Sequence, residues 1–188
     1  MSRTGELRRS VFMLTWFIRK ELAKFERDFG YDVTYMREVL DADPSAFLLF
    51  ARVQKLSHYC KDAPPAAWFA AKLAGAMAED CGPCTQLVVL MAERAGIAAS
   101  EISAIVRGDE AAMSGDARLG YRFAKTALAH GDMEPIHHEV KRWGKRAAVS
   151  LAFAVVAARM YPTLKYALGF GKTCQRVTVG GEIVPVAA

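Results

Sequence analysis

Two cysteines three positions apart, Cys81 and Cys84, are the residues whose types and spacing most clearly allow chemistry. At a helix N-terminus this spacing can bring the two Cα atoms within the roughly 4.4–6.8 Å that a disulfide requires. The unpaired amides and the dipole of a helix start stabilise a thiolate and lower a thiol pKa from about 8.5. A thiolate with a second thiol nearby is the minimum equipment for thiol–disulfide exchange or peroxide reduction.

Two other interpretations of the pair stay open, namely two small buried hydrophobes or half of a metal site. A zinc site needs about four ligands, and the sequence has no second Cys-x-x-Cys pair. His137 and His138 are adjacent, which does not favour convergence on one ion. We therefore favour redox chemistry and expect neither a metal nor another cofactor.

The run Cys81-Gly82-Pro83-Cys84 also matches the thioredoxin active site, where a strand leads directly into the motif. Residues 66–78 are instead alanine-rich with helical spacing. The tetrapeptide is thus expected on a different fold.

Two further residues are candidates for acid–base work beside the pair. Glu79 precedes Cys81 by two positions and becomes a local base if it is partly buried. His58 ends a predicted helix just before Tyr59 and Cys60. Each also has a structural alternative. Glu79 could be an acid near a helix start that interacts favourably with the helix dipole, and His58 could simply end its helix. Cys60 and Cys174 are expected to be core or tail thiols.

The elements that must position these residues are almost all helical up to about residue 170. Apolar residues recur at three-to-four spacing, Pro44 follows the capping residue Asp43, and Gly96 ends the helix after the cysteines. The expected helices cover residues 11–29, 34–40, 43–59, 66–79, 80–95, 100–106, 116–129, 135–143, 145–160 and 162–168.

The end of the chain changes character. Two short β-branched runs, 177–179 and 182–184, flank Gly180-Gly181 and predict a hairpin. Because an isolated hairpin is marginal in water, it must dock on the helical body or on a neighbouring chain.

Composition sets the fold class. The chain has 188 residues, 53% hydrophobic and 24% charged, which excludes a disordered or collagen-like chain, and four cysteines are too few for a disulfide-stapled scaffold. We expect one all-α domain over 1–188, with N-terminal helices in 7–60 and a hairpin tail in 174–186.

The net charge of +5 is unevenly distributed. Residues 31–140 carry ten Lys/Arg against fifteen Asp/Glu, whereas residues 141–188 carry eight against one. No run interleaves several basic residues with aromatics, so nucleic-acid binding is not expected. The basic end is expected to be solvated or to meet an acidic face of a neighbouring subunit.

Targeting signals give the expected location. Arg8-Arg9 precedes an apolar run that is interrupted by Thr15 and lacks a small-residue cleavage site. The apolar stretch 147–158 is shorter than the roughly 18 residues that a bilayer needs. We expect a cytoplasmic protein that does not enter a membrane.

The chain resembles the carboxymuconolactone decarboxylase and alkylhydroperoxidase D-like family. The similarity lies in the run Cys81 to Val89 and in residues 92–97, 102–109, 121–124 and 143–144, and it covers about residues 65–165. The resemblance implies an all-helical homo-oligomer that reduces peroxides through the pair, with Cys84 attacking and Cys81 resolving. A partner thiol reductant of unknown identity would then restore the dithiol.

Two family features are missing from their usual positions. The histidine one turn after the second cysteine is replaced by Val88, and residues 68–72 lack the upstream glutamate. Without that histidine, helix-terminus physics favours attack by Cys81, which is expected to be the more exposed thiol. The choice between the two cysteines therefore stays open.

Assembly is expected from three features: the hairpin, the aromatic first helix and the opposite charges of 31–140 and 141–188. A catalytically silent helical oligomer that keeps the pair for structure or protein interaction is the alternative to the enzyme.

Overall fold

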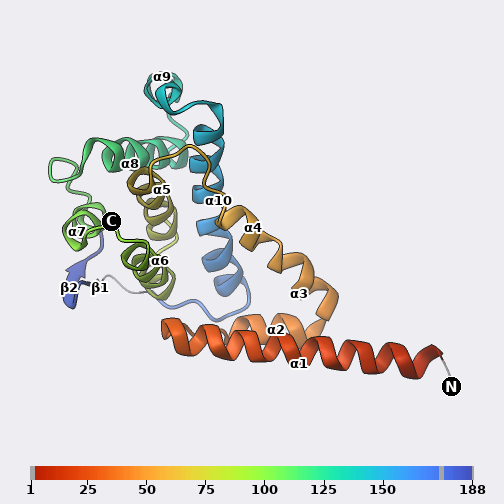
Figure 1. Cartoon of the computed structure of the whole chain (residues 1–188). Helices are drawn as coiled ribbons and strands as arrows, with labels where there is room; N and C mark the ends of the chain where they lie inside the picture. Colours follow the sequence, from red (N-terminus) through yellow and green to blue (C-terminus); the bar gives the residue numbers. More distant parts are fainter. Residues whose placement is uncertain (1–2, 174–175, 188) are drawn as a thin grey trace. The chain divides into compact units, whose positions relative to one another are not determined.

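The computed structural model describes residues 3–173 and 176–187, with side chains described from Phe12 onward. This part of the chain is helical apart from one antiparallel two-stranded hairpin (Figure 1). The predicted all-α class with a C-terminal hairpin is confirmed. The chain divides into two compact units, residues 1–53 and 54–188. The prediction of a single domain stays a prediction, because compactness alone does not establish whether a unit folds independently.

The first unit contains three helices: α1 (Arg3–Phe29), α2 (Thr34–Ala42) and α3 (Pro44–Ala51). The ion pairs Arg19–Asp41 and Arg37–Glu26 join α1 to α2. The core of this unit consists of aromatic and aliphatic side chains: Leu22, Tyr31, Val33, Tyr35, Leu40 and Phe47.

The start of α3 follows the predicted capping signal. The Asp43 carboxylate accepts a hydrogen bond from the Ser45 amide at 2.7 Å, and Pro44 occupies the first turn. A bond from the Ser45 side chain and the one from the amide hold the pKa of Asp43 below its usual value. The helix predicted over 43–59 is wrong in extent, because α3 ends at Ala51 and a separate short helix, α4 (Val53–Ser57), follows.

The second unit is built around α5 (Pro65–Met77). It also contains α6 (Gly82–Arg94), α7 (Ala99–Arg107), α8 (Gly115–Leu128), α9 (Glu134–Val140), the 3₁₀ helix η1 (Lys141–Trp143) and α10 (Lys145–Ala167). Figure 1 shows α5 with α6, α8 and α10 around it.

Helix α5 is buried on all sides, since every residue from Ala67 to Ala76 is buried. Its small side chains let neighbouring helices approach closely. The closest approach is made by Gly120 of α8, where a Cβ would overlap the backbone of Ala67. A helix that is apolar all round in this way is typical of the centre of a core.

Helix α10 is one continuous helix, although the sequence predicts two pieces separated at Pro162. Proline removes one intrahelical hydrogen bond, but Pro162 is buried and the packing against α5 outweighs that loss. Within the described residues, α10 is the one helix long and apolar enough to cross a membrane by length and composition. The core helices of soluble proteins meet the same criterion.

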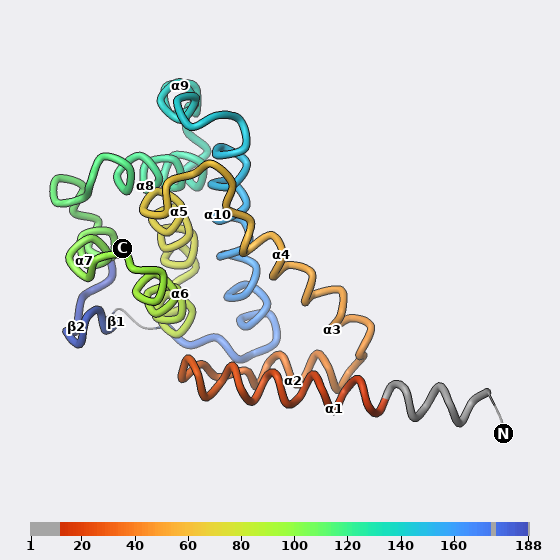
Figure 2. The backbone as a smooth tube through the Cα atoms, in the orientation of Figure 1, coloured from red at the N-terminus to blue at the C-terminus, as the bar shows by residue number. Residues whose placement is uncertain are grey.

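The hairpin pairs β1 (Arg176–Val179) with β2 (Glu182–Pro185), and it docks on the helices of its own unit. The Gln86 side-chain amide of α6 donates to the Thr178 carbonyl at 2.9 Å and accepts from the Thr178 amide at 2.7 Å. The Ala187 amide donates to the Val106 carbonyl of α7 at 2.8 Å. Figure 2 shows this end of the chain beside α7. The first two positions of the predicted tail, including Cys174, lie outside the described residues.

Candidate functional site

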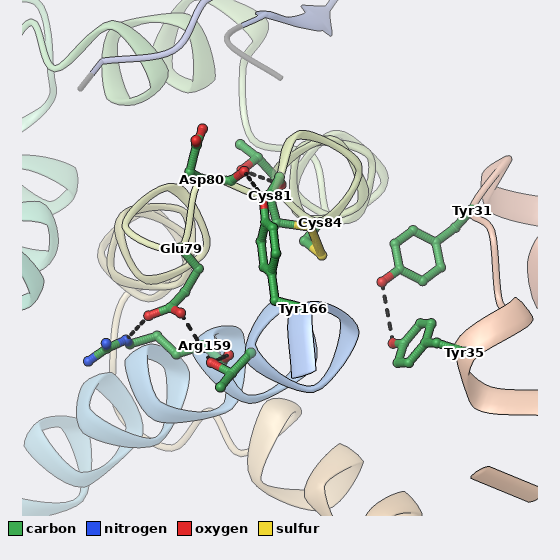
Figure 3. Close-up of a disulfide and its surroundings, with 10 residues drawn as sticks. Tyr31, Tyr35, Glu79, Asp80, Cys81, Cys84, Arg159 and Tyr166 are labelled. Carbon is green, nitrogen blue, oxygen red and sulfur yellow. Dashed lines mark hydrogen bonds and ion pairs between the residues drawn. A yellow bond between two sulfur atoms is a disulfide. The ribbon is translucent and has the colours of Figure 1, made fainter. Parts of the chain in front are cut away.

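The structure joins Cys81 and Cys84 in a disulfide whose Cα atoms lie 5.3 Å apart (Figure 3). Cys81 is the N-cap of α6 in an extended conformation, so Cys84 falls on the third residue of the helix. Pro83 is in the first turn, where its missing N–H costs nothing. The Thr85 amide and hydroxyl donate to the Cys81 carbonyl at 2.9 and 3.2 Å. The predicted juxtaposition of the two cysteines at a helix start is thus present.

Both sulfur-bearing side chains are buried, with Cys81 1% and Cys84 5% exposed. The expectation that Cys81 is the more exposed thiol is wrong, because the cap position is covered by its surroundings. Val88, one turn after Cys84, is buried and apolar, so it supplies no proton relay.

The backbone immediately before the pair has an unusual conformation. Asp80 has φ of +47°, in the left-handed region that non-glycine residues seldom occupy. This residue turns the chain sharply from the end of α5 into the extended Cys81. The position of the first cysteine therefore depends on a strained turn.

Glu79 is oriented toward α10. Its carboxylate is 16% exposed and accepts hydrogen bonds from Arg159 Nε and from the Thr163 hydroxyl, the latter at 3.1 Å. In Figure 3 the carboxylate points toward Arg159, away from the disulfide. Glu79 thus anchors the turn that leads to Cys81.

Tyr166 of α10 holds the next residue of the same turn. Its hydroxyl donates to the Asp80 carbonyl at 2.8 Å. Slight desolvation and the neighbouring Asp80 carboxylate raise the pKa of the Tyr166 phenol above its usual value, and the hydroxyl is protonated at neutral pH. Figure 3 shows Tyr166 reaching from α10 to the turn beside Cys81.

Sequence reasoning missed these three contacts. Arg159, Thr163 and Tyr166 are spaced by four and three residues, which places them on one helical face. The predicted helix break at Pro162 separated Arg159 from the other two. A prediction of one continuous helix over this segment would have placed the three residues on one face.

His58 lies in the segment that leads into α5, whereas the cysteines follow α5. Its exposed ring donates from Nδ1 to the Gln54 carbonyl at 2.7 Å, within its own helical turn. The structure therefore brings Cys81 and Cys84 together, whereas the Glu79 carboxylate binds α10 and the His58 ring binds the Gln54 carbonyl.

A buried lysine, also missed in the sequence, lies near His58. Lys72 is only 4% exposed, and its Nζ donates to the Ser57 carbonyl at 2.7 Å and lies 4.4 Å from the centre of the Trp68 ring. Burial lowers the pKa of Lys72 to about 8. The nearby Cys60 is a free thiol at an exposed position, not in the core, and partial desolvation raises its pKa despite the positive charge of Lys72. A raised thiol pKa disfavours the reactive thiolate.

Residues that bind metals do not gather elsewhere in the described part of the chain. No group of three or more His, Cys, Asp or Glu there could hold a metal ion.

The basic C-terminal segment is partly neutralised within the chain. Three of its arginines pair with carboxylates from residues 31–140, as Arg142–Asp116 at 3.2 Å, Arg146–Asp62 at 2.7 Å and Arg159–Glu79. The charge asymmetry seen in the sequence therefore has an explanation inside the second unit and does not require an acidic neighbour.

A surface hollow of about 350 Å³ lies between α8, α9 and η1. Arg118, Arg122 and Arg142 line it together with Glu139. Arg122 pairs with Glu110 and Arg142 with Asp116, so carboxylates balance most of its positive charge. This hollow is separate from the disulfide.

No family model, no curated protein and no solved structure matches this chain. The disulfide and its surroundings therefore carry the functional argument.

Proposed function

We propose that this protein is a thiol-dependent oxidoreductase that reduces a peroxide or exchanges disulfides through Cys81 and Cys84. The observation that carries the proposal is the disulfide itself, formed between the N-cap and the third residue of α6. In the reduced protein the same geometry places both thiols at a helix start, where the dipole and the amides favour the thiolate.

The reaction with a peroxide takes two steps that balance. A cysteine thiolate attacks one peroxide oxygen, the O–O bond breaks, and the products are a cysteine sulfenic acid and, after protonation, an alcohol or water. The second thiol then displaces water from the sulfenic acid and closes the Cys81–Cys84 disulfide. An external dithiol reduces the disulfide by exchange and is itself oxidised to a disulfide.

The resemblance to the alkylhydroperoxidase D-like family assigns the attack to Cys84 and the resolution to Cys81. Since both side chains are buried, exposure no longer favours Cys81. Dipole stabilisation still favours the residue nearest the helix start. We propose Cys84 as the attacking thiol and Glu79, which precedes Cys81 by two positions, as its local base after release from Arg159.

The experiment treats reduced Cys81→Ser and Cys84→Ser proteins with peroxide and a sulfenic-acid trap, with Cys60→Ser as the matched control. Trapping on Cys84 in the Cys81→Ser protein, with little on Cys81 in the other, supports the assignment. The reverse pattern rejects Cys84 as the attacking thiol. Absence of trapping in both variants, together with failure to exchange with glutathione, rejects the redox function.

The burial of both cysteines favours a second candidate, a disulfide that serves structure or protein interaction without catalysis. Thiol counting with and without mild peroxide separates the two. A redox pair loses two thiols reversibly in the native protein, whereas a structural pair stays oxidised until the protein unfolds.

We propose that the protein acts in the cytoplasm as a homo-oligomer. The hairpin docks within the chain and the basic segment is partly neutralised there, so the support comes from the exposed apolar face of α1: Phe12, Met13, Trp16 and Phe17. Large apolar side chains that lie exposed side by side mark interaction sites. Light scattering should give a multiple of 20.6 kDa at micromolar concentration, and a monomeric mass would contradict the proposal.

A further inference from the structure

One face of α10 holds both residues that precede Cys81. Arg159 and Thr163 bind the Glu79 carboxylate, and the Tyr166 hydroxyl binds the Asp80 carbonyl at 2.8 Å. These interactions join residues 80 and more positions apart in sequence, so they depend on the packing of α10 against α5.

The turn needs such an anchor, because Asp80 is in the left-handed region and Cys81 is extended. Strained backbone of this kind persists only where the surroundings fix it. The Tyr166 hydrogen bond acts on the peptide group that joins Asp80 to Cys81, so it acts directly on the backbone of the first cysteine of the pair.

We propose that Tyr166 is a positioning residue for the Cys81–Cys84 redox pair. Its hydrogen bond keeps the backbone of Cys81 in place after reduction, so that the two thiols remain at the separation from which the disulfide closes. This inference rests on the proposed function only in assuming that the pair cycles between dithiol and disulfide.

The expected consequence is thermodynamic. If the turn is held, little conformational entropy is lost on closing the disulfide, whereas a released turn must be ordered each time. Losing the anchor therefore makes the disulfide easier to reduce and slower to close.

Two variants remove the anchor in different ways. Tyr166→Phe deletes the hydroxyl but keeps the ring. Gly171→Ala keeps the hydroxyl, but its new Cβ would overlap the Tyr166 ring and displace it. Gly171 is outside the positive-φ region, so alanine is tolerated by its backbone.

The measurement is the equilibrium of the native pair with glutathione, read by thiol alkylation and mass. We expect each variant to lower the oxidation equilibrium constant by about three- to tenfold, which is a rise of the reduction potential by roughly 14–30 mV. The double variant should shift no further than the larger single shift, since both changes break one contact.

Ser150→Ala is the matched control. Ser150 lies on the same helix and makes the analogous bonds to the other loop, accepting from the Lys61 amide at 2.8 Å and donating to the Lys61 carbonyl at 3.0 Å. It should leave the potential of the pair unchanged, and circular dichroism verifies that all variants are folded.

A shift of less than twofold in both Tyr166→Phe and Gly171→Ala, or an equal shift in Ser150→Ala, overturns the positioning role. The equilibrium requires no peroxide turnover. If the protein lacks peroxidase activity but the variants shift the potential, the peroxidase proposal fails and the positioning role of Tyr166 stands. If the protein reduces peroxide but the variants do not shift the potential, the positioning role fails and the peroxidase proposal stands.

Discussion

Two cysteine-bearing segments lie at opposite ends of α5 and are built alike in several respects. The loop before α5 contains Cys60 and Asp62, and the turn after it contains Asp80 and Cys81. Each aspartate has positive φ, at +62° and +47°. Helix α10 holds both segments, through Arg146 and Ser150 at one end and Arg159, Thr163 and Tyr166 at the other.

The two segments differ in the state of their cysteines, which is a free thiol in one and a disulfide in the other. The Cys60 thiol lies near buried Lys72, yet its pKa is raised, because desolvation outweighs the charge of the lysine. Cys81 has a second cysteine one helical turn away and closes a disulfide. The comparison teaches that a cation beside a thiol need not lower the thiol pKa, whereas a second cysteine at a helix start allows a disulfide, which the proposed function uses as its redox couple.

The largest expected effect on the redox transition comes from removing one member of the pair. Cys81→Ser or Cys84→Ser should abolish the reversible two-thiol transition and destabilise the oxidised protein by about 2 kcal/mol through the lost cross-link. Cys60→Ser should leave the transition intact and change stability by less than about 0.5 kcal/mol. Glutathione titration and urea unfolding measure both. An altered transition in Cys60→Ser would mean that the two segments are not independent.

The next prediction concerns folding stability and the contact of α8 with α5, the helix between the two segments. Gly120→Ala introduces a Cβ that overlaps the Ala67 backbone, near the start of α5. Overpacking against backbone should cost about 3 kcal/mol. Urea unfolding tests this expectation, with the exposed Gly115→Ala as control, because a Cβ there meets nothing within 4 Å. A loss below about 1 kcal/mol would show that α5 and α8 pack less closely than described.

The buried lysine should produce a smaller, pH-dependent effect. Folded Lys72 loses its proton near pH 8, whereas the unfolded chain keeps it up to about 10.5. The unfolded state therefore binds more protons between these values, and stability due to this group rises with pH. Relative to Lys72→Met, the wild type should gain about 1–2 kcal/mol between roughly pH 7.5 and 9.5. The control is Lys61→Met, at an exposed position of the loop before α5. Parallel pH profiles of wild type and Lys72→Met would refute a depressed pKa.

The smallest expected effect concerns the strained turn. Alanine at position 80 must adopt φ of +47°, whereas glycine does so freely. We expect Asp80→Ala to be less stable than Asp80→Gly by about 1 kcal/mol. Thermal unfolding of the two variants measures the difference, and equal stabilities would show that the turn is not held in this conformation.

Local patterns were sufficient to predict much of this protein. Helical spacing and the Asp43-Pro44 cap gave most helices, the diglycine gave the hairpin, and the cysteine spacing gave the disulfide partners. These features depend on residues that are close in sequence.

The failures have a common cause, which is that packing between distant segments decides them. Pro162 remains inside α10 because the helix is buried against α5, and only the continuous helix aligns Arg159 with Thr163 and Tyr166. Lys72 was missed because its acceptor, the Ser57 carbonyl, belongs to another element. The near-equal burial of Cys81 and Cys84 likewise depends on what covers the start of α6.

A thiol count on the native wild-type protein tests the central claim most directly. The reduced protein is treated with mild peroxide, then with a dithiol, and alkylated thiols are located by mass spectrometry at each step. The account predicts that Cys81 and Cys84 alone lose their thiols together with peroxide and regain them with the dithiol, while Cys60 stays alkylatable throughout. Retention of both thiols under peroxide, or oxidation of Cys60 in preference to the pair, would contradict it.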